Sequence, residues 1–189
     1  LEVKELSALA RVSVQDITLN QLHIKTPHSE IGNFLSLKYS HFRDFKKFLD
    51  GVKMDVRLTD SRFSLKDLSY FVKGMAKVEH NTFRVNGRFK GSVSEIDGRN
   101  IEIRTAANTF FAGDFSTRGL PNIFETSLNV RVKKLSTTAQ DVKSIYPPVK
   151  LPTNLSTLVL IRYSGTFDGF VTDFVSNGKL ETQIGSATT

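Results

Sequence analysis

The sequence predicts a mostly β protein assembled from a repeated unit. Apolar and polar residues alternate with a period of two along several segments, which gives an extended strand one apolar face. The motif G-x-F-x-G-x-V-x-acid-apolar also occurs twice, in VNGRFKGSVSEIDG (residues 85–98) and in YSGTFDGFVTDFVSNG (163–178). Its six matching positions share one offset, which indicates an internal structural repeat.

Each copy of the motif continues an alternating segment, so we predict two long strands over residues 83–93 and 159–171. At about 3.3 Å per residue, each strand would run about 40 Å, roughly twice the usual length. The glycines of the motif fall on the apolar face, where they predict bends or close approaches. The apolar-face residues are Phe83, Val85, Phe89 and Val93 in the first segment, and Val159, Ile161, Tyr163, Phe167 and Val171 in the second.

A second match lies upstream of each motif, in SLKDLSYF (64–71) and TAQDVKSI (138–145). Both segments predict short helices, with Ser64 and Thr138 as N-caps and an aspartate in the first turn. The repeating unit is therefore a strand, a helical turn, a long strand with the glycine motif, and further strands. We predict a single β-rich array with units over residues 1–55, 56–130 and 131–189, of which the first and last are partial.

The remaining segments also predict strands and turns. Residues 11–26 read as strands whose apolar phase slips twice, as at bulges or tight bends. SHFRDFKKFLDG (40–51) changes to helical spacing, with Ser40 as N-cap and Gly51 after the end. Residues 119–122 predict a turn, and the proline-rich YPPVKLPTN (146–154) predicts a loop outside the sheet. Further strands are expected over residues 34–39, 52–58, 99–105, 108–120 and 125–135.

The composition favours a binding or structural protein over an enzyme. Lys and Arg number 26 against 19 Asp and Glu, but the bases are spread along polar strand faces, so no nucleic-acid partner is expected. There is no cysteine, and the four histidines lack ligand spacing, so we expect no metal site and no cofactor. Glu95 and Asp173 share one motif position, which is typical of turn or cap residues rather than of a catalytic pair.

No apolar run approaches the ~20 residues of a membrane helix, and LEVKELSALA lacks the order of a signal peptide. Because the pattern is interrupted at both termini, we interpret the sequence as an interior piece of a longer protein.

Taken together, these motifs resemble the TamB (translocation and assembly module) family of the wider AsmA-like, bridge-like lipid transfer group. The resemblance covers most of residues 34–189. It rests on SLKYSHFRDFKKFLDGVKMDVRLTDSRFSLKDLSYF, VNGRFKGSVSEIDGRNIEIRTAANTFFAGDFSTRGLPN and GTFDGFVTDFVSNGKLETQIGSATT.

The resemblance implies an elongated, curled antiparallel sheet that forms an open trough with an apolar interior and a few short helices. It further implies a periplasmic protein, anchored in the inner membrane outside this segment, that conducts phospholipid acyl chains toward an outer-membrane barrel partner and supports outer-membrane protein assembly.

The residues themselves leave three interpretations open. An apolar face repeated along an array must be covered by protein or by a ligand. The 15 phenylalanines therefore fit either an acyl-lined groove formed by the nine apolar-face residues named above or the core of an ordinary β-sandwich binding domain. A third interpretation is a chaperone or scaffold whose exposed sheet edges pair with strands of outer-membrane proteins.

Overall fold

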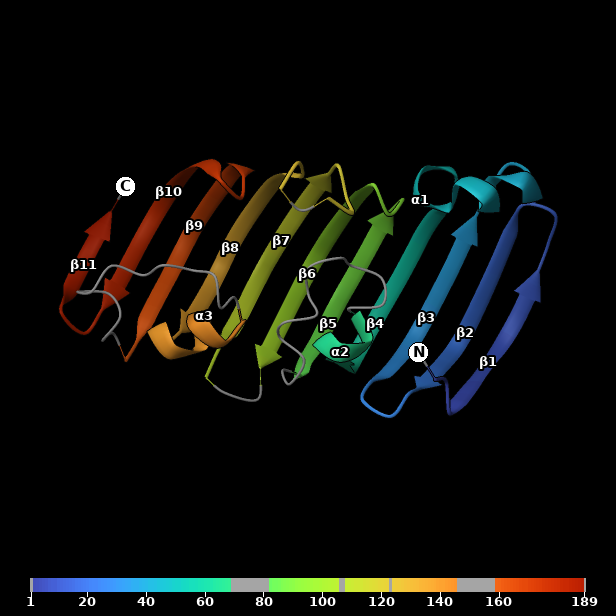
Figure 1. The fold of residues 1–189 in the computed structure, drawn as a ribbon, viewed down its shortest axis with the longest axis horizontal. Coiled ribbons are helices and arrows are strands. Elements are labelled where there is room, and N and C mark those ends of the chain that lie inside the picture. The colour runs from blue at the N-terminus through green and yellow to red at the C-terminus, as the bar shows by residue number, and fades with distance from the viewer. Residues whose placement is uncertain (1, 69–81, 106–107, 123, 146–158, 189) are drawn as a thin grey trace.

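The computed structural model describes residues 2–68, 82–105, 108–122, 124–145 and 159–188. These residues form one antiparallel sheet of eleven strands, and the order of the strands in the sheet is their order in the sequence (Figure 1). The prediction of a mostly β, elongated and open antiparallel sheet is confirmed. The sheet does not close, because β1 and β11 lie at opposite ends of the array and do not pair.

Among the described strands, β1 to β10 have eight to twelve residues each and β11 has four, and short helices follow only some of them. The strands are β1 (Glu5–Val12), β2 (Asp16–Lys25), β3 (Glu30–Lys38), β4 (Lys53–Ser64), β5 (Thr82–Gly91), β6 (Glu95–Thr105), β7 (Phe110–Arg118), β8 (Ser127–Thr137), β9 (Ile161–Phe170), β10 (Asp173–Thr182) and β11 (Gly185–Thr188). The described helices are η1 (Phe42–Lys47), α1 (Phe48–Gly51), α2 (Leu65–Leu68) and α3 (Ala139–Ile145).

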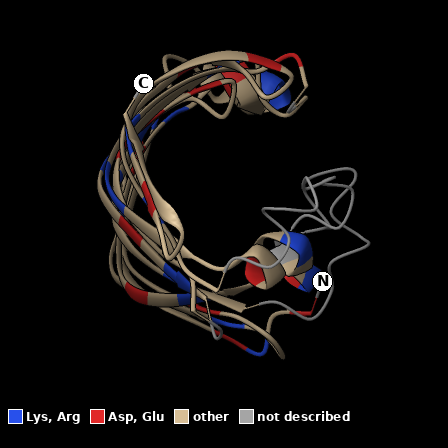
Figure 2. Ribbon diagram, turned by 90° about the vertical axis from the view of Figure 1, so that its left-hand side faces the viewer, with Lys and Arg blue, Asp and Glu red and all other residues tan. Residues whose placement is uncertain are grey.

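The strands bow along their length, so that a view along the array shows a C-shaped section (Figure 2). The cause lies in β-bulges at mid-strand. β2, β4, β6 and β8 each contain an extra residue relative to their neighbours, around residues 20–22, 59–61, 99–101 and 133–134. A bulge bends the strand that carries it and increases its twist. Bulges at the same level in alternate strands from β2 to β8 therefore bend this part of the sheet along one line.

Two features stabilise this bend line. In three of the bulges one residue has positive φ, namely Gln21, Asp60 and Asn100. The amide of Asp60 donates to Asn86 Oδ1 at 2.6 Å, and the amide of Asn100 donates to Asp114 Oδ1 at 2.7 Å. Side chains from adjacent strands therefore satisfy bulge amides that the ladder leaves unpaired.

Glycines occupy the intervening strands at the level of the bulges. They are Gly32 in β3, Gly87 in β5, Gly113 in β7 and Gly165 in β9. Gly87 has φ of 136°, and a Cβ atom there would lie 2.5 Å from Ile101 Cδ1 and 3.0 Å from Asn100 O. The side chain of Ile101 occupies the space that a larger residue would need. The prediction that the motif glycines mark bends and close approaches is confirmed.

The helices of the repeat are capped as predicted. Ser64 Oγ accepts from the amide of Lys66 at 3.2 Å, and Thr138 Oγ1 accepts from the amide of Asp141 at 3.0 Å. For the helix predicted over residues 40–51, both predicted ends are wrong. His41 precedes η1, and Asp44 Oδ2 accepts from the amides of Ser40 and His41, both at 2.9 Å. Ser40 is therefore not the N-cap, and Gly51 is the last residue of α1 rather than the residue after it.

The predicted uninterrupted strands over 83–93 and 159–171 are wrong, because each glycine motif spans a hairpin. β5 ends at Gly91 and β6 begins at Glu95, while β9 ends at Phe170 and β10 begins at Asp173. Glu95 and Asp173 thus begin strands directly after turns. The predicted turn at 119–122 is present. Residues 69–71 of the first predicted helix and the proline-rich segment 146–154 lie outside the described residues.

A further internal match in the sequence relates the β1–β2 hairpin to the β5–β6 hairpin. At an offset of 79, VSVQDITLNQLHIKT (12–26) aligns with GSVSEIDGRNIEIRT (91–105). Gln21 and Asn100 correspond and both have φ of 51°. Ser13 and Ser92 correspond, and each hydroxyl accepts from the amide three residues later. β1, β5 and β9 are therefore equivalent strands, each followed by an equivalent hairpin.

We predict that Gly87→Ala destabilises the fold by more than about 1 kcal/mol, because the new methyl group needs both positive φ and space that Ile101 occupies. Gly185→Ala is the matched control, since Gly185 has φ of 150° but nothing within 4 Å of its would-be Cβ. Urea denaturation measures both variants. Equal losses of unfolding free energy would show that packing at the bend line contributes nothing.

Candidate functional site

The candidate site is the apolar face of the sheet. Side chains that oppose each other on neighbouring strands share a face, so the pairing registers define rows that run across the sheet. One row contains Ala10, Leu19, Leu35, Val56, Phe89, Gly98, Phe115, Val130, Phe167 and Ser176. The row beside it contains Val12, Ile17, Leu37, Met54, Gly91, Ile96, Thr117, Leu128, Gly169 and Phe174.

A third apolar row lies on the other side of the bend line. It contains Ser61, Val85, Ile103, Phe111, Leu135, Tyr163, Leu180 and Ala187. With strands about 4.8 Å apart, eleven strands form an array about 48 Å long. The face is therefore apolar along the whole array, at right angles to the strands.

The apolar face is the concave one. Thr137 lies two residues after Leu135 of the third row, and its hydroxyl is 2.7 Å from Thr109 Oγ1, which also donates to Asp141 of α3 at 3.0 Å. α3 and α2 lie in front of the lower ends of the strands in Figure 1, and at this level in Figure 2 the helices are on the open side of the arc. The face that contacts these helices is therefore the inner face.

Curvature partly buries this face although the described residues form only one sheet. Leu58, Val85 and Val132 are each 9% exposed, and Ile101 is 1% exposed. Side chains converge on the inside of a bend, so neighbours in the same layer exclude water from one another. The aromatic residues are larger and remain half-buried, including Phe89, Phe115 and Phe167.

Two aromatic pairs lie on this face, one between β5 and β7 and one between β9 and β10. The rings of Phe89 and Phe115 are 6.0 Å apart, and the Phe115 ring covers Gly98 on the strand between them. Phe167 and Phe174 stack at 4.3 Å. Glycines thus provide shallow places in the face that aromatic rings from adjacent strands occupy.

The structure places six of the nine predicted groove residues on this face. Phe83, Val85 and Phe89 lie in β5, and Ile161, Tyr163 and Phe167 lie in β9. Val93 and Val171 lie instead in the hairpin turns, and Val159 precedes β9 and is 73% exposed. The three-residue and two-residue turns interrupt the strands that would have placed these valines on the face.

The prediction from sequence missed most of the face. The residues it did not assign include Ile17, Leu19, Leu35, Val56, Ile96, Ile103, Phe111, Phe115, Leu128 and Val130. The signal for these residues is the period-two alternation of the other strands. It identifies them when it is used to assign the apolar face of every strand and not only of the two motif strands.

The molecule exposes more surface than a compact protein of its size. Its solvent-accessible area is 12126 Å² at 21.2 kDa, whereas a compact monomer of that mass exposes about 9,100 Å². None of the described phenylalanines is buried. The described strands therefore do not form the two facing sheets and aromatic core of a sandwich.

Two buried aspartates tie helices α2 and α3 to the sheet. Asp67 Oδ2 of α2 accepts from Thr26 Oγ1 and Ser29 Oγ, both at 2.5 Å. Asp141 Oδ2 of α3 accepts from Thr109 Oγ1 at 3.0 Å and from the amide of Asn108 at 2.8 Å. These two residues occupy matching positions in the repeat and each ties a helix to the preceding hairpin.

The pKa of Asp67 is lowered overall. Burial acts to raise it, but the hydrogen bonds from Ser29 and Thr26 favour the carboxylate and outweigh burial. A carboxylate with a depressed folded pKa stabilises the fold above its unfolded pKa of about 3.9, and this contribution is lost as the pH falls through the folded pKa.

The opposite, convex face is polar. Arg88 Nε donates to Asp55 at 2.9 Å, and this pairing lowers the pKa of Asp55. Lys133 lies 3.1 Å from Asp114, whose pKa is lowered first by the Asn100 amide and then by Lys133. Figure 2 shows acidic and basic residues interspersed along the strands. Within the described ranges, no three His, Asp or Glu residues are grouped to hold a metal ion.

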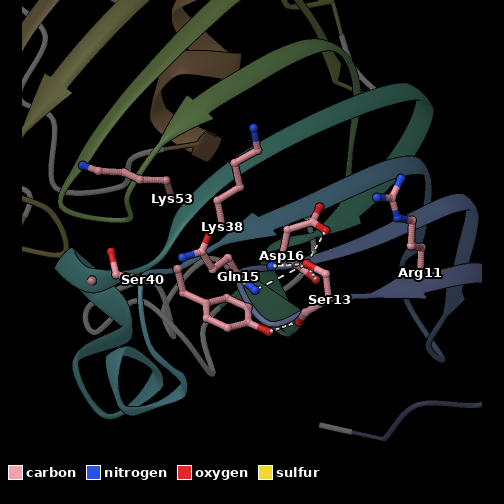
Figure 3. Close-up of a pocket in the computed structure, with 9 residues that line it drawn as sticks. Arg11, Ser13, Gln15, Asp16, Lys38, Ser40 and Lys53 are labelled. Carbon is pink, nitrogen blue, oxygen red and sulfur yellow. Dashed lines mark hydrogen bonds between the residues drawn. The ribbon is translucent and has the colours of Figure 1, made fainter.

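A polar cleft of about 630 Å³ lies between the β1–β2 turn, the end of β3, Gly51 of α1 and the start of β4 (Figure 3). Within this cleft, the Ser13 hydroxyl donates to Asp16 Oδ1 at 2.9 Å and the Ser13 carbonyl accepts from Tyr39 Oη at 3.0 Å. Hydrogen bonds from Thr18 and Ser13 lower the pKa of Asp16. Asp16, the only carboxylate among the described residues that line this cleft, is thus engaged in holding the β1–β2 turn. The lining residues are Arg11, Ser13, Gln15, Asp16, Lys38, Tyr39, Ser40, Gly51 and Lys53.

No family model matches the chain, and no curated protein or solved structure matches it. In the part of the chain that the structure describes, no helix has the length and apolar character needed to span a membrane.

We predict that Asp67→Asn lowers the unfolding free energy at pH 7 by about 1 to 3 kcal/mol, because two hydrogen bonds lose their charged acceptor. The difference between variant and parent should shrink as the pH falls below about 4 and the parent carboxyl protonates. Asp173→Asn, at an exposed position, is the control. A loss that stays constant down to pH 2 would contradict this role for the carboxylate.

Proposed function

We propose that the concave apolar face binds lipid acyl chains and serves as a segment of a conduit that carries lipids between the inner and outer membranes. The observation that carries this proposal is the continuity of the apolar rows across the array, on the inner side of a bent single sheet. The resemblance of the sequence to the TamB family implies the same activity and supports it.

The proposed groove would run along the array, because the first two rows cross β1 to β10 and the third crosses β4 to β11. An acyl chain in the groove would pass from strand to strand and meet a similar apolar surface at each step. Burying a chain of 16 carbons at about 0.8 kcal/mol per methylene offers roughly 12 kcal/mol before losses. The repetition of similar shallow sites favours movement along the groove over capture at one place.

The partial exposure of the aromatic residues also supports this proposal. Phe89, Phe115 and Phe167 are half-buried by their own layer, so an occupant can remove further apolar area from water. The convex face has ion pairs and cation–π contacts in place of apolar rows, including Arg57 over Phe34 at 4.6 Å. The two faces thus suit an apolar ligand inside and water outside.

The proposal includes the setting that the resemblance implies. The full-length protein would be anchored in the inner membrane, cross the periplasm, and meet an outer-membrane barrel partner while supporting outer-membrane protein assembly. Phospholipid acyl chains would be the ligand, and the proposal requires no catalytic step and no cofactor.

The alternative is a chaperone or scaffold that binds strands of outer-membrane proteins at its edges. The observation that favours this function is the exposed apolar edge strand β1, in which Leu6 is 65% and Val12 is 70% exposed. Such binding would depend on the backbone of the client and not on the length of an acyl chain.

We predict that Phe167→Glu weakens binding of a fluorescent 16-carbon fatty acid at least about tenfold, because it places a charge in the centre of the groove. Thr166→Glu is the matched control, since Thr166 is the neighbouring residue on the convex face and lies opposite Arg131 and Asn177. Phe89→Glu, at the equivalent position in β5, should behave like Phe167→Glu. Fluorescence titration measures all three variants, and circular dichroism checks that they are folded.

Native mass spectrometry of the purified protein provides an independent test, because captured phospholipid adds a defined mass. Equal fatty-acid affinity in Phe167→Glu and Thr166→Glu, together with no lipid adduct, would falsify the conduit proposal.

A further inference from the structure

The bulge of β8 differs from the other bulges of the bend line. Its two residues, Lys133 and Lys134, lie between Val132 and Leu135 and oppose the single residue Ser164 of β9. In the bulges of β2, β4 and β6 one residue has positive φ, whereas neither lysine of β8 does. A bulge can also redirect a side chain. The β8 bulge is therefore a place where the repeat has been altered and where side chains take new directions.

Both lysines lie on the convex face. Consecutive residues of a regular strand point to opposite faces, so one of two adjacent lysines would enter the apolar groove. Lys133 Nζ instead lies 3.1 Å from Asp114 Oδ2 on the convex face. Lys134 Nζ lies 5.7 Å from the centre of the Phe110 ring, and Phe110 alternates with the residues of the third apolar row. The bulge thus places two cations side by side outside the groove.

The two lysines line a cleft between β8, β9 and β10. Its volume is about 290 Å³, just below the usual range for ligand pockets, so it suits a small chemical group. The register places Arg162 opposite Glu181 and Ser164 opposite Lys179. Three strands therefore supply neighbouring polar side chains. The lining residues are Lys133, Lys134, Leu135, Arg162, Tyr163, Ser164, Lys179 and Glu181.

Cations outnumber carboxylates in the lining of this cleft by four to one. Glu181 is occupied by Lys179, whose Nζ lies 2.6 Å from Glu181 Oε1. Lys133 is occupied by Asp114. Within the described ranges, no carboxylate makes an ion pair with Lys134 or with Arg162. Because like charges on adjacent strands repel each other, an anion between them would be stabilising.

A fifth cation lies beside the cleft. The guanidinium of Arg104 is 4.7 Å from the centre of the Phe110 ring, which Lys134 also contacts. A cation–π contact stabilises a cation without neutralising its charge. Arg104 and Arg162 belong to one row of the convex face, with Phe110 and Ser136 between them. The positive charge therefore extends across five strands, from β6 to β10.

The cleft at the β4 bulge shows that a cationic lining is not a general consequence of a bulge in this sheet. Its volume is about 250 Å³, and its charged lining residues are His23, Glu30, Asp60, Arg62 and Arg84. Glu30 contacts His23 at 3.0 Å and Arg62 at 3.9 Å. Asp60 contacts Arg84 at 3.2 Å. Each of these side chains has a partner of opposite sign, whereas the β8 cleft has a surplus of cations.

We propose that the cleft between β8, β9 and β10 is a binding site for a phosphate group. Arg162 can offer parallel N–H donors to two phosphate oxygens, and Lys134 adds a compact charge. The Ser164 hydroxyl can donate a further hydrogen bond. A phosphate has several oxygens, so it can accept from all three side chains at once. The sheet separates this site from the concave face, so it is distinct from the acyl-chain groove.

Titration with inorganic phosphate, followed by the amide chemical shifts of the isotope-labelled protein, tests this proposal. Sodium chloride at matched ionic strength is the reference. The amides of Lys134, Arg162 and Ser164 should shift with phosphate and reach saturation. Equal shifts in chloride, or phosphate shifts confined to the cleft around Lys38, would overturn the proposal.

Substitutions separate a specific site from general positive charge. Lys134→Gln and Arg162→Gln should each weaken phosphate binding at least about threefold, because each removes a charged donor. Arg131→Gln is the matched control, since Arg131 lies on the convex face of β8 but does not line the cleft. It should change the affinity less than about twofold, because salt screens distant exposed charges. Equal losses in the three variants would overturn the site.

The same variants keep this test separate from the proposed function. Lys134→Gln should leave fatty-acid binding unchanged, because Lys134 lies on the face opposite the groove. If the protein bound no fatty acid at all, the phosphate titration would still show whether this site exists.

Vesicles distinguish inorganic phosphate from the phosphate of a lipid headgroup. If a headgroup is the natural source, vesicles of phosphatidylcholine and phosphatidylglycerol should displace inorganic phosphate, and phosphatidylcholine alone should not. Lys134→Gln should then weaken vesicle binding and Arg131→Gln should not. If neither vesicle displaces inorganic phosphate, the ligand is a soluble phosphate or phosphate ester, which also agrees with the proposal. Vesicle binding that both variants reduce equally would count against a site in this cleft.

Discussion

The arrangement of the whole molecule depends on one line of backbone irregularity across the sheet. An extra residue in every second strand, from β2 to β8, lies beside a glycine in the strand between. Without the bulges, eleven strands of this length would form a twisted but unbowed sheet with no concave side. Without the glycines, side chains such as Ile101 would have no room at the bend. Curvature in turn lets one layer of apolar residues shield itself in part, which no flat single sheet achieves.

This construction indicates how the described strands can be stabilised within a single sheet. Each strand contacts chiefly its neighbours in sequence, so stability accumulates along the array from hairpin to hairpin, as in other repeat proteins. The aspartates of α2 and α3 fasten the rim once per unit. The ion pairs of the convex face are exposed or half-exposed, and pairs of this kind contribute little each. The main stabilising surface is therefore the concave face, which is also the proposed binding surface.

Several features were predictable from sequence because they depend on local chemistry. Alternation identified strands, Ser64 and Thr138 identified helix starts, and the phase slip between Leu19 and Leu22 identified the β2 bulge. The hairpin inside the glycine motif was missed because residues 92–94 contain no Gly, Pro or Asn. The apolar phase changes from odd positions in β5 to even positions, such as Ile96, in β6, and that change was the available signal. Which residues share each apolar row depends on the pairing register between neighbouring strands. The bulges set this register, and the alternation within a single strand does not encode it.

The central claim is that the concave face, and not the convex face or the sheet edges, holds acyl chains. Photolabelling with a 16-carbon fatty acid that carries a diazirine near its methyl end, followed by peptide mass spectrometry, tests this directly. The account predicts adducts on residues of the three apolar rows across several strands, including Val56, Phe115 and Val130, with the convex residues between them unlabelled. Adducts spread equally over both faces, or confined to β1 and β11, would contradict it.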